Sequence, residues 1–178
     1  MSKAFRLRSS LAVVLGVLAA APAFAANPAT ISVTVTIQNL SVSASGPIAF
    51  GTVIGGSQTV AGSASTITND GNVVETMSLS LTNPGSWTAV QAAPGAEEYA
   101  LLAQFNGAAP TAASFVYADH ALTTTSVASS ATKFAGGQTG LSMAAAATRN
   151  LWFRFNAPTS TAVTTQQTIS VTVTASAG

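Results

Sequence analysis

Ile-Ser-Val-Thr-Val-Thr occurs at residues 31–36 and again at residues 169–174 of this 178-residue chain. Both copies alternate apolar and hydroxyl side chains with a period of two, which is typical of a β-strand with one buried and one solvated face. The sequence between the copies shows no internal repeat. The two hexapeptides therefore predict the first and last strands of one domain, and the first strand pairs either in its own subunit or in the next one.

The first 25 residues have the three parts of a secretory signal peptide. These parts are a basic start with Lys3, Arg6 and Arg8, an apolar stretch at residues 11–21, and Ala23-Phe24-Ala25 as a cleavage pattern. The apolar stretch is short for an anchor that spans a bilayer. We therefore expect cleavage after Ala25, export by a Sec-type route, and no membrane span after cleavage.

Composition narrows the class of protein further. The 153 residues after position 25 are enough for one domain with one core, and they carry three basic and five acidic side chains, for a net charge of −2. No basic patch remains to hold phosphates, so nucleic acid is excluded as a partner. The chain has no Cys, so an exported fold would be held without disulfides. We expect a secreted bacterial protein that lies outside the cell or at the cell surface. The alternative location is the periplasm.

Several further segments alternate like strands and are separated by turn signals. The predicted strands lie at residues 30–38, 48–50, 64–68, 73–82, 87–91, 99–106, 148–156 and 168–175. Asn69-Asp70-Gly71-Asn72 is a strong hairpin signal, because Asp and Gly tolerate the positive φ of a type I′ turn. Residues 107–147 are rich in Ala, Ser, Thr and Gly and form either a poorly encoded hairpin or a surface excursion. With no helical pattern outside the signal peptide, the chain is predicted to be all-β, an antiparallel sandwich.

Three segments together resemble the signature of Hydin-type immunoglobulin-like domains. They are Ile-Ala-Phe-Gly-Thr-Val at residues 48–53, Gly-Gly-Ser at 55–57 and Ile-Thr-Asn-Asp-Gly-Asn at 67–72. The resemblance implies a single immunoglobulin-like antiparallel β-sandwich with an interaction or structural role and no catalytic residues. The expected organisation is a signal peptide at residues 1–25, an N-terminal strand segment at 26–45 and the sandwich at 46–178. More loosely, a strand near the mature N-terminus resembles strand-donating chaperone–usher pilins and TasA-like fibre subunits.

The polar residues do not form an evident catalytic or metal site. Asp119 precedes His120, the only histidine, but sequence neighbours rarely supply the acid on the far side of an imidazole, so both are expected in a solvated loop. Asp70 with its flanking asparagines is shorter than a calcium loop and is better explained as a hairpin turn. Glu97 and Glu98 are adjacent, so on a strand they would face opposite sides instead of working as a pair. We predict no enzyme, no metal and no cofactor.

The function expected from these features is that of a non-catalytic subunit of a filament, pilus-like fibre or coat. An unpaired strand edge accepts another strand through its backbone groups. The predicted partners are further copies or other exported surface proteins. The alternative is an exported adhesin or a glycan-binding β-sandwich module, with Trp152 as the contact to a glycan. The candidate assembly residues are Ile31, Val33, Val35 and Ile37 in the first strand and Ile169, Val171 and Val173 in the last.

Overall fold

Strands make up almost all the regular structure of residues 29–178, the part of the chain that the computed structural model describes. Residues 36–178 belong to one unit, and residues 29–35 are considered by themselves. The predicted signal peptide at residues 1–25 lies outside the described residues. The chain is therefore all-β over this range, as its sequence predicts.

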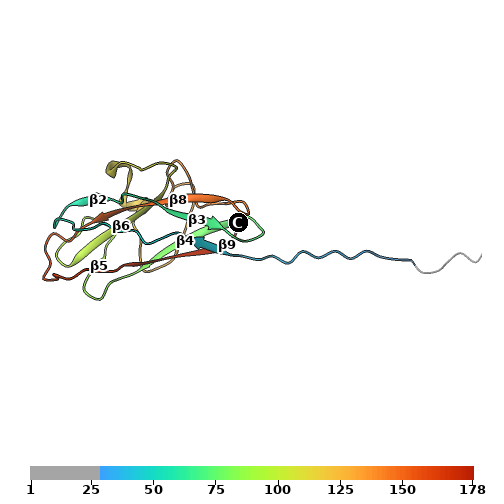
Figure 1. Cartoon of the computed structure of the whole chain (residues 1–178), viewed down its shortest axis with the longest axis horizontal. Coiled ribbons are helices and arrows are strands. Elements are labelled where there is room, and N and C mark those ends of the chain that lie inside the picture. Colours follow the sequence, from blue (N-terminus) through green and yellow to red (C-terminus); the bar gives the residue numbers. More distant parts are fainter. Residues whose placement is uncertain (1–28) are drawn as a thin grey trace, which may run out of the picture. The chain divides into compact units, whose positions relative to one another are not determined.

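The larger of two sheets has six strands. Its order is β1 (Val42–Ala44), β3 (Ser65–Asn69), β8 (Thr148–Asn156), β6 (Glu98–Phe105) and β5 (Thr88–Ala89), and β2 (Gln58–Val60) also pairs with β8. Every pairing in this sheet is antiparallel except the one between β5 and β6. The long strands β6 and β8 lie side by side in this sheet (Figure 1). Together they supply seven of the sixteen buried residues of the main core.

The smaller sheet has the order β7 (Val127–Ala128), β4 (Glu75–Thr82) and β9 (Ser170–Ala177). The second copy of the hexapeptide thus forms the last strand, as predicted. Strands β4 and β9 pair over eight residues, from Glu75 opposite Ala177 to Thr82 opposite Ser170. In the described part of the chain no strand pairs with the other edge of β9.

The two sheets bury one continuous core between them. Apolar side chains at every second position of the long strands turn one face of each sheet inward. From the smaller sheet the core takes Met77, Leu79 and Leu81, and from the larger one it takes Ile67, Tyr99, Leu101, Phe105, Leu151, Phe153 and Phe155. This packing makes the arrangement sandwich-like.

Residues 107–147 form a surface excursion. The segment contains a 3₁₀ turn, η1 (Ala112–Ser114), a single helical turn, α1 (Tyr117–His120), and β7. Phe115 and Ala121 from this segment pack with Ala100 and Leu102, which point to the outer side of β6. The first part of the excursion therefore covers the outer face of the larger sheet. Its later part adds β7 to the smaller sheet and buries Leu122, Phe134 and Met143 in the main core.

Two predicted strands are not formed. No strand is assigned among residues 29–41, although residues 30–38 have the alternation of one, and none is assigned at residues 48–50. Alternation reports that a segment has one apolar face, whereas a strand also needs a neighbour that pairs with its backbone groups. Segment 48–50 places Ile48 and Phe50 against the core without such pairing.

The turn between β3 and β4 is not the predicted hairpin, because β3 and β4 pair in different sheets and neither Asp70 nor Gly71 has a positive φ. The turn is built on the buried side chain of Asn69. Its amide nitrogen donates hydrogen bonds to the carbonyl oxygens of Val73 (2.8 Å) and Met143 (2.9 Å). Its Oδ1 accepts the N–H of Gly71 at 2.9 Å. With these three hydrogen bonds the Asn69 side chain is occupied by the turn itself.

The same turn holds the residues that precede β1. Asn72 Oδ1 accepts the N–H of Asn39, and its Nδ2 donates to the carbonyl oxygen of Ile37, each at 2.8 Å. The carboxylate of Glu75, which is fully buried, accepts the N–H of Ser41 at 2.8 Å. We call this set of contacts the turn clamp; it fixes the chain at residues 37–41 against the beginning of β4.

Substituting Gly71→Ala is expected to destabilise the protein through the turn clamp. The new Cβ would clash with Glu75 Oε1 and lie 2.5 Å from the carbonyl oxygen of Asn39. Overpacking of this kind costs about 1–3 kcal/mol of unfolding free energy, which urea denaturation measures. Gly62→Ala is the matched control, because its Cβ meets nothing within 4 Å. Equal unfolding midpoints for the two variants would contradict the close packing around Gly71.

Candidate assembly surface

An open groove lies between β9 and residues 46–53, the segment that connects β1 to β2. Its volume is about 1110 Å³. Ile169, Val171 and Val173 form the β9 wall, Ile48, Phe50 and Val53 form the opposite wall, and Ile67, Leu101, Leu151, Phe153 and Phe155 lie between them. None of the lining residues carries a charge. The groove is therefore an uncharged surface whose apolar floor is continuous with the core, and the loop before β9 adds hydroxyl and amide side chains such as those of Thr165 and Gln166.

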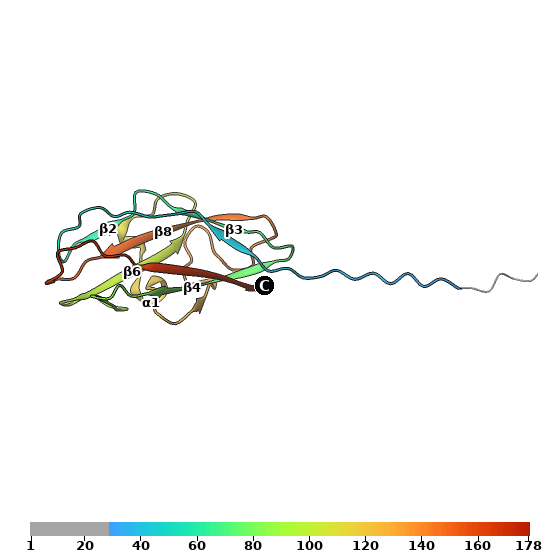
Figure 2. The same ribbon diagram turned by 60° about the horizontal axis from the view of Figure 1, so that its bottom comes forward.

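The groove exists because the smaller sheet does not cover the whole inner face of the larger one. On β4, which has a neighbour on each side, Leu79 is fully buried and Leu81 is 3% exposed. On β9, the corresponding inward residues Val171 and Val173 are only half-buried. Figure 2 shows β9 as the dark red strand alongside β4. One further strand beside β9 would complete the cover.

The edge of β9 that faces away from β4 presents backbone N–H and C=O groups beside the groove. Gly178 donates its N–H to the carbonyl oxygen of Val74, so even-numbered residues of this end of the chain direct their backbone groups towards β4. The N–H and C=O groups of Val171, Val173 and Ala175 therefore point the other way. Because these side chains also face inward, β9 offers backbone hydrogen bonds and an apolar face at the same place.

Residues 30–38, which we call the N-terminal arm, carry the other predicted assembly residues. Ile31, Val33, Val35 and Ile37 are 84%, 86%, 85% and 79% exposed. In an extended chain these four side chains share one face. The structure thus places Ile169, Val171 and Val173 together on the groove wall and leaves the arm residues exposed to solvent.

The wall opposite β9 did not appear among the residues predicted from sequence to take part in assembly. Phe50 packs its ring 5.5 Å from the ring of Phe155, and Ile48 and Val53 are half-buried beside it. The sequence signal was the apolar alternation at residues 48–50, which we interpreted as a strand. The same alternation also suits a segment that lies on a core without strand pairing.

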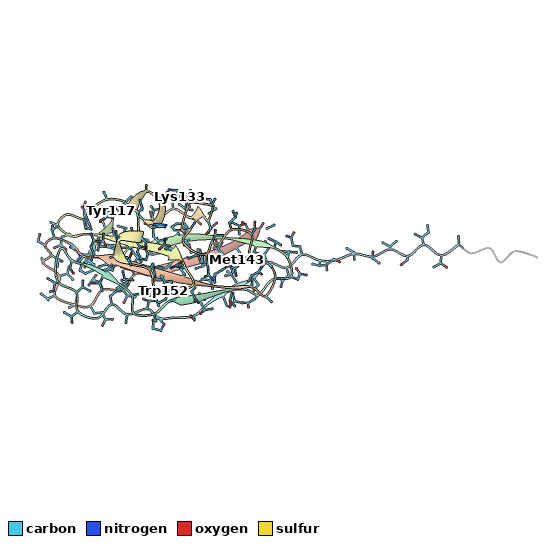
Figure 3. The ribbon with its side chains drawn as sticks, turned by 90° about the horizontal axis from the view of Figure 1, so that it is seen from above. Tyr117, Lys133, Met143 and Trp152 are labelled. Atoms are coloured by element: carbon cyan, nitrogen blue, oxygen red, sulfur yellow. The ribbon has the colours of Figure 1, made fainter. Side chains whose placement is uncertain are left out.

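Trp152, the candidate glycan contact, lies on β8 and is half-buried (Figure 3). Its indole Nε1 donates to the carbonyl oxygen of Asn106 at 3.0 Å. The ring packs against the outer cluster that contains Ala100 and Leu102. Much of the indole is therefore engaged in holding the outer side of the larger sheet.

His120 is buried, which corrects the prediction that it lies in a solvated loop. Its ring is 3% exposed, Nδ1 accepts the N–H of Val116 at 2.8 Å, and Nε2 lies 3.0 Å from the carbonyl oxygen of Ala135. With Nδ1 as acceptor, the proton sits on Nε2 and is donated to Ala135. Nδ1 thus closes the helical turn of α1 itself, and Nε2 ties that turn to Ala135 later in the excursion.

Arg154 is a buried cation that the sequence did not reveal as such. Its guanidinium lies 5.6 Å from the ring centre of Phe115 and 5.5 Å from that of Tyr117. Nη1 donates to the carbonyl oxygens of Ala112 (2.5 Å) and Phe115 (3.1 Å). Burial lowers the pKa of Arg154, opposed in part by Tyr117. Cation–π contacts and carbonyl acceptors therefore hold the excursion on the outer side of β8.

The two adjacent glutamates act on different loops. Glu97 accepts hydrogen bonds from the N–H of Ala162 at 2.5 Å and from the hydroxyl of Thr161 at 2.7 Å. Glu98 accepts the N–H of Gly95 at 2.8 Å. The hydrogen bond from Ala162, followed by that from Thr161, lowers the pKa of Glu97 below its ordinary value of 4.5. Glu97 thus pins the loop before β9, which forms one end of the groove.

The described residues lack two further features, a metal-binding cluster and a membrane-spanning helix. Among residues 29–178 no three His, Asp or Glu side chains are grouped closely enough to hold a metal ion. No helix in the same range is long and apolar enough to cross a membrane.

Comparison of the chain with models of protein families, with curated proteins and with solved structures finds no match in any of the three. The function is therefore argued from the groove, the free edge of β9 and the arm.

Glu97→Gln is expected to weaken the dependence of stability on acid pH. Because the folded state holds the pKa of Glu97 below 4.5, its stabilising effect is complete above that pH and is lost as the pH falls through the lower, folded-state value. The parent should therefore lose more unfolding free energy than the variant between about pH 5 and pH 3. Thr161→Val keeps the carboxylate but removes one hydrogen bond, so it should show an intermediate slope. Identical slopes in denaturation series for all three proteins would contradict the assignment.

Proposed function

We propose that this chain is a secreted bacterial structural protein, a non-catalytic subunit of a filament, pilus-like fibre or coat that associates with further copies of itself through its N-terminal arm. The observation that carries the proposal is the arm, with four large aliphatic side chains at strand spacing, each at least 79% exposed. Full burial of one such side chain contributes about 1.5–3 kcal/mol. Association that covers the arm is therefore strongly favoured over leaving it in water.

Low charge supports close packing between copies. Beyond position 25 the chain carries eight charged side chains, three basic and five acidic. Glu75, Glu97, Glu98 and Arg154 are among those that make hydrogen bonds within the sandwich. Few charges are thus left on the surface to repel a second copy of the same chain.

The finer class of the fold belongs to the same proposal. An immunoglobulin-like sandwich is supported by the mainly antiparallel pairing in two facing sheets and by the turn clamp, which gives Asn69 and Asn72 defined structural roles. Export by the signal peptide would place the subunit outside the cytoplasm. The adhesin alternative depends on Trp152, whose indole is engaged at the outer cluster, so no observation favours it as a second function.

The proposal predicts concentration-dependent assembly of the mature chain, residues 26–178. Sedimentation velocity and electron microscopy should show multimers for the parent protein. Val33→Asp with Val35→Asp should abolish them, because two carboxylates would enter an apolar contact. Ser32→Asp with Thr34→Asp adds the same charge on the hydroxyl face and should leave assembly in place. A parent protein that stays monomeric at millimolar concentration would overturn the proposed function.

A further inference from the structure

We infer that the groove beside β9 receives the N-terminal arm of a second copy, that this arm runs antiparallel to β9, and that the copies therefore join head to tail. The inference rests on the proposed function, since it names the surface that accepts the arm and the direction in which the arm lies. It makes each subunit both a donor of one strand and an acceptor of another.

The backbone of β9 is ready for such a strand. Val171, Val173 and Ala175 direct their N–H and C=O groups to the free edge. Their side chains turn inward, and those of Val171 and Val173 line the groove. In antiparallel pairs the residues directly opposite each other point to the same face. An arm that pairs with these groups through Val33 and Val35 therefore inserts its apolar side chains into the groove, whereas a register slipped by one residue would insert its hydroxyls.

Length and chemistry also match. At about 3.3 Å per residue, the seven arm residues from Ile31 to Ile37 span about 23 Å and the eight residues of β9 about 26 Å. The arm has no charged residue, and the groove lining has none. An engineered apolar cavity of about 150 Å³ already holds a benzene ring, so a groove of about 1110 Å³ has room for several aliphatic side chains and their backbone.

The identity of the occupant follows from the repeated hexapeptide. Residues 169–174 show that Ile-Ser-Val-Thr-Val-Thr pairs antiparallel in this sandwich, with Val171 opposite Leu81 and Val173 opposite Leu79. The same six residues at 31–36 have the same spacing of apolar and hydroxyl side chains. A second copy of this chain therefore brings to β9 a segment that is already suited to this sheet.

The place at which the arm is attached makes it difficult for the arm to enter the groove of its own domain. The turn clamp holds Ile37 to Asn72, beside the start of β4, and Glu75 pairs there with Ala177 at the end of β9. An arm that folded back along its own β9 would therefore run from the end of β9 towards its start. Its chain direction would then be parallel to β9, and the chain would have to reverse sharply just before the clamped residues.

Because the turn clamp fixes Ile37 beside the end of β9, the direction in which an inserted arm runs depends on how the copies are arranged. If two copies exchanged arms around a twofold axis, each arm would enter the partner groove at the end of β9, again in the parallel direction. If copies instead repeat in one orientation, the arm enters the neighbouring groove where β9 begins and runs antiparallel to it. Head-to-tail contacts generate open filaments or rings, whereas twofold exchange closes at a dimer. Antiparallel insertion is thus the geometry of a fibre.

Disulfide mapping tests the direction, because the chain contains no Cys. We would place one cysteine in the arm, by Val33→Cys or Val35→Cys, and a second in β9, by Val171→Cys, Val173→Cys or Ala175→Cys, in the full mature chain. Directly opposite residues in a hydrogen-bonded antiparallel pair have Cα atoms about 5.5 Å apart, within the range that a disulfide bridges. Oxidised samples are then separated on non-reducing gels. Thr172→Cys, on the opposite face of β9, is the control.

The expected result is a ladder of covalent multimers in which the strongest pairs are 33 with 175 and 35 with 173. Moving the arm cysteine forward by two residues should move its best partner backward by two. The Thr172→Cys control should give at least about tenfold less product, since its side chain points away from the groove.

Other patterns would overturn the inference and leave the proposed function standing. These are multimers without cross-links to β9, covalent dimers joined at 33 with 173 and 35 with 175, and a fast-migrating monomer with an internal disulfide in an otherwise assembled sample. If instead neither the parent nor any variant assembles, the proposed function fails as well. The two failures are therefore distinguishable in one set of gels and a sedimentation run.

Discussion

The buried side chain of Asn69 is the interaction on which much of the remaining geometry depends. It joins the turn after β3 to the carbonyl oxygen of Met143, more than seventy residues further along the chain. The neighbouring carboxylate of Glu75 is fully buried and accepts the N–H of Ser41. A buried amide or carboxylate without partners would be costly. These hydrogen bonds therefore help to determine the point from which the arm leaves the sandwich, beside the end of β9.

A second constraint is the unequal size of the two sheets. Three strands face six, and the difference is taken up on two sides. On the outer side of the larger sheet, the excursion at residues 107–147 supplies cover, held by the contacts of Arg154 with Phe115 and Tyr117. On the inner side, no strand covers the larger sheet between β9 and the segment at residues 46–53, and this gap is the groove. The open groove is thus the one part of this imbalance that the described chain leaves uncovered.

Period-two alternation was enough to predict the long strands of both sheets. The segments at residues 73–82, 99–106, 148–156 and 168–175 correspond closely to β4, β6, β8 and β9. Alternation could not predict which segments find a neighbour, and so it failed at residues 30–38 and 48–50. It also carries no information on contacts between distant carbonyl groups and polar side chains. His120 was therefore expected in solvent, whereas carbonyl and amide groups of the excursion bury it.

The predicted assembly residues on β9 and in the arm were chosen by this one pattern, which did not identify the groove wall opposite β9. The pattern marks apolar faces, and a groove requires the arrangement of two such faces in space.

The repeated hexapeptide provides its own comparison between a paired and an unpaired strand. The local sequence is identical in the two copies, so intrinsic strand propensity is the same for both. At residues 169–174 the segment lies beside β4 and its apolar side chains are half-buried, whereas at residues 31–36 no strand is assigned and they are more than 80% exposed. The difference must come from what lies beside each copy. In the head-to-tail assembly proposed above, the free strand edge and the groove of a neighbouring copy would remove that difference.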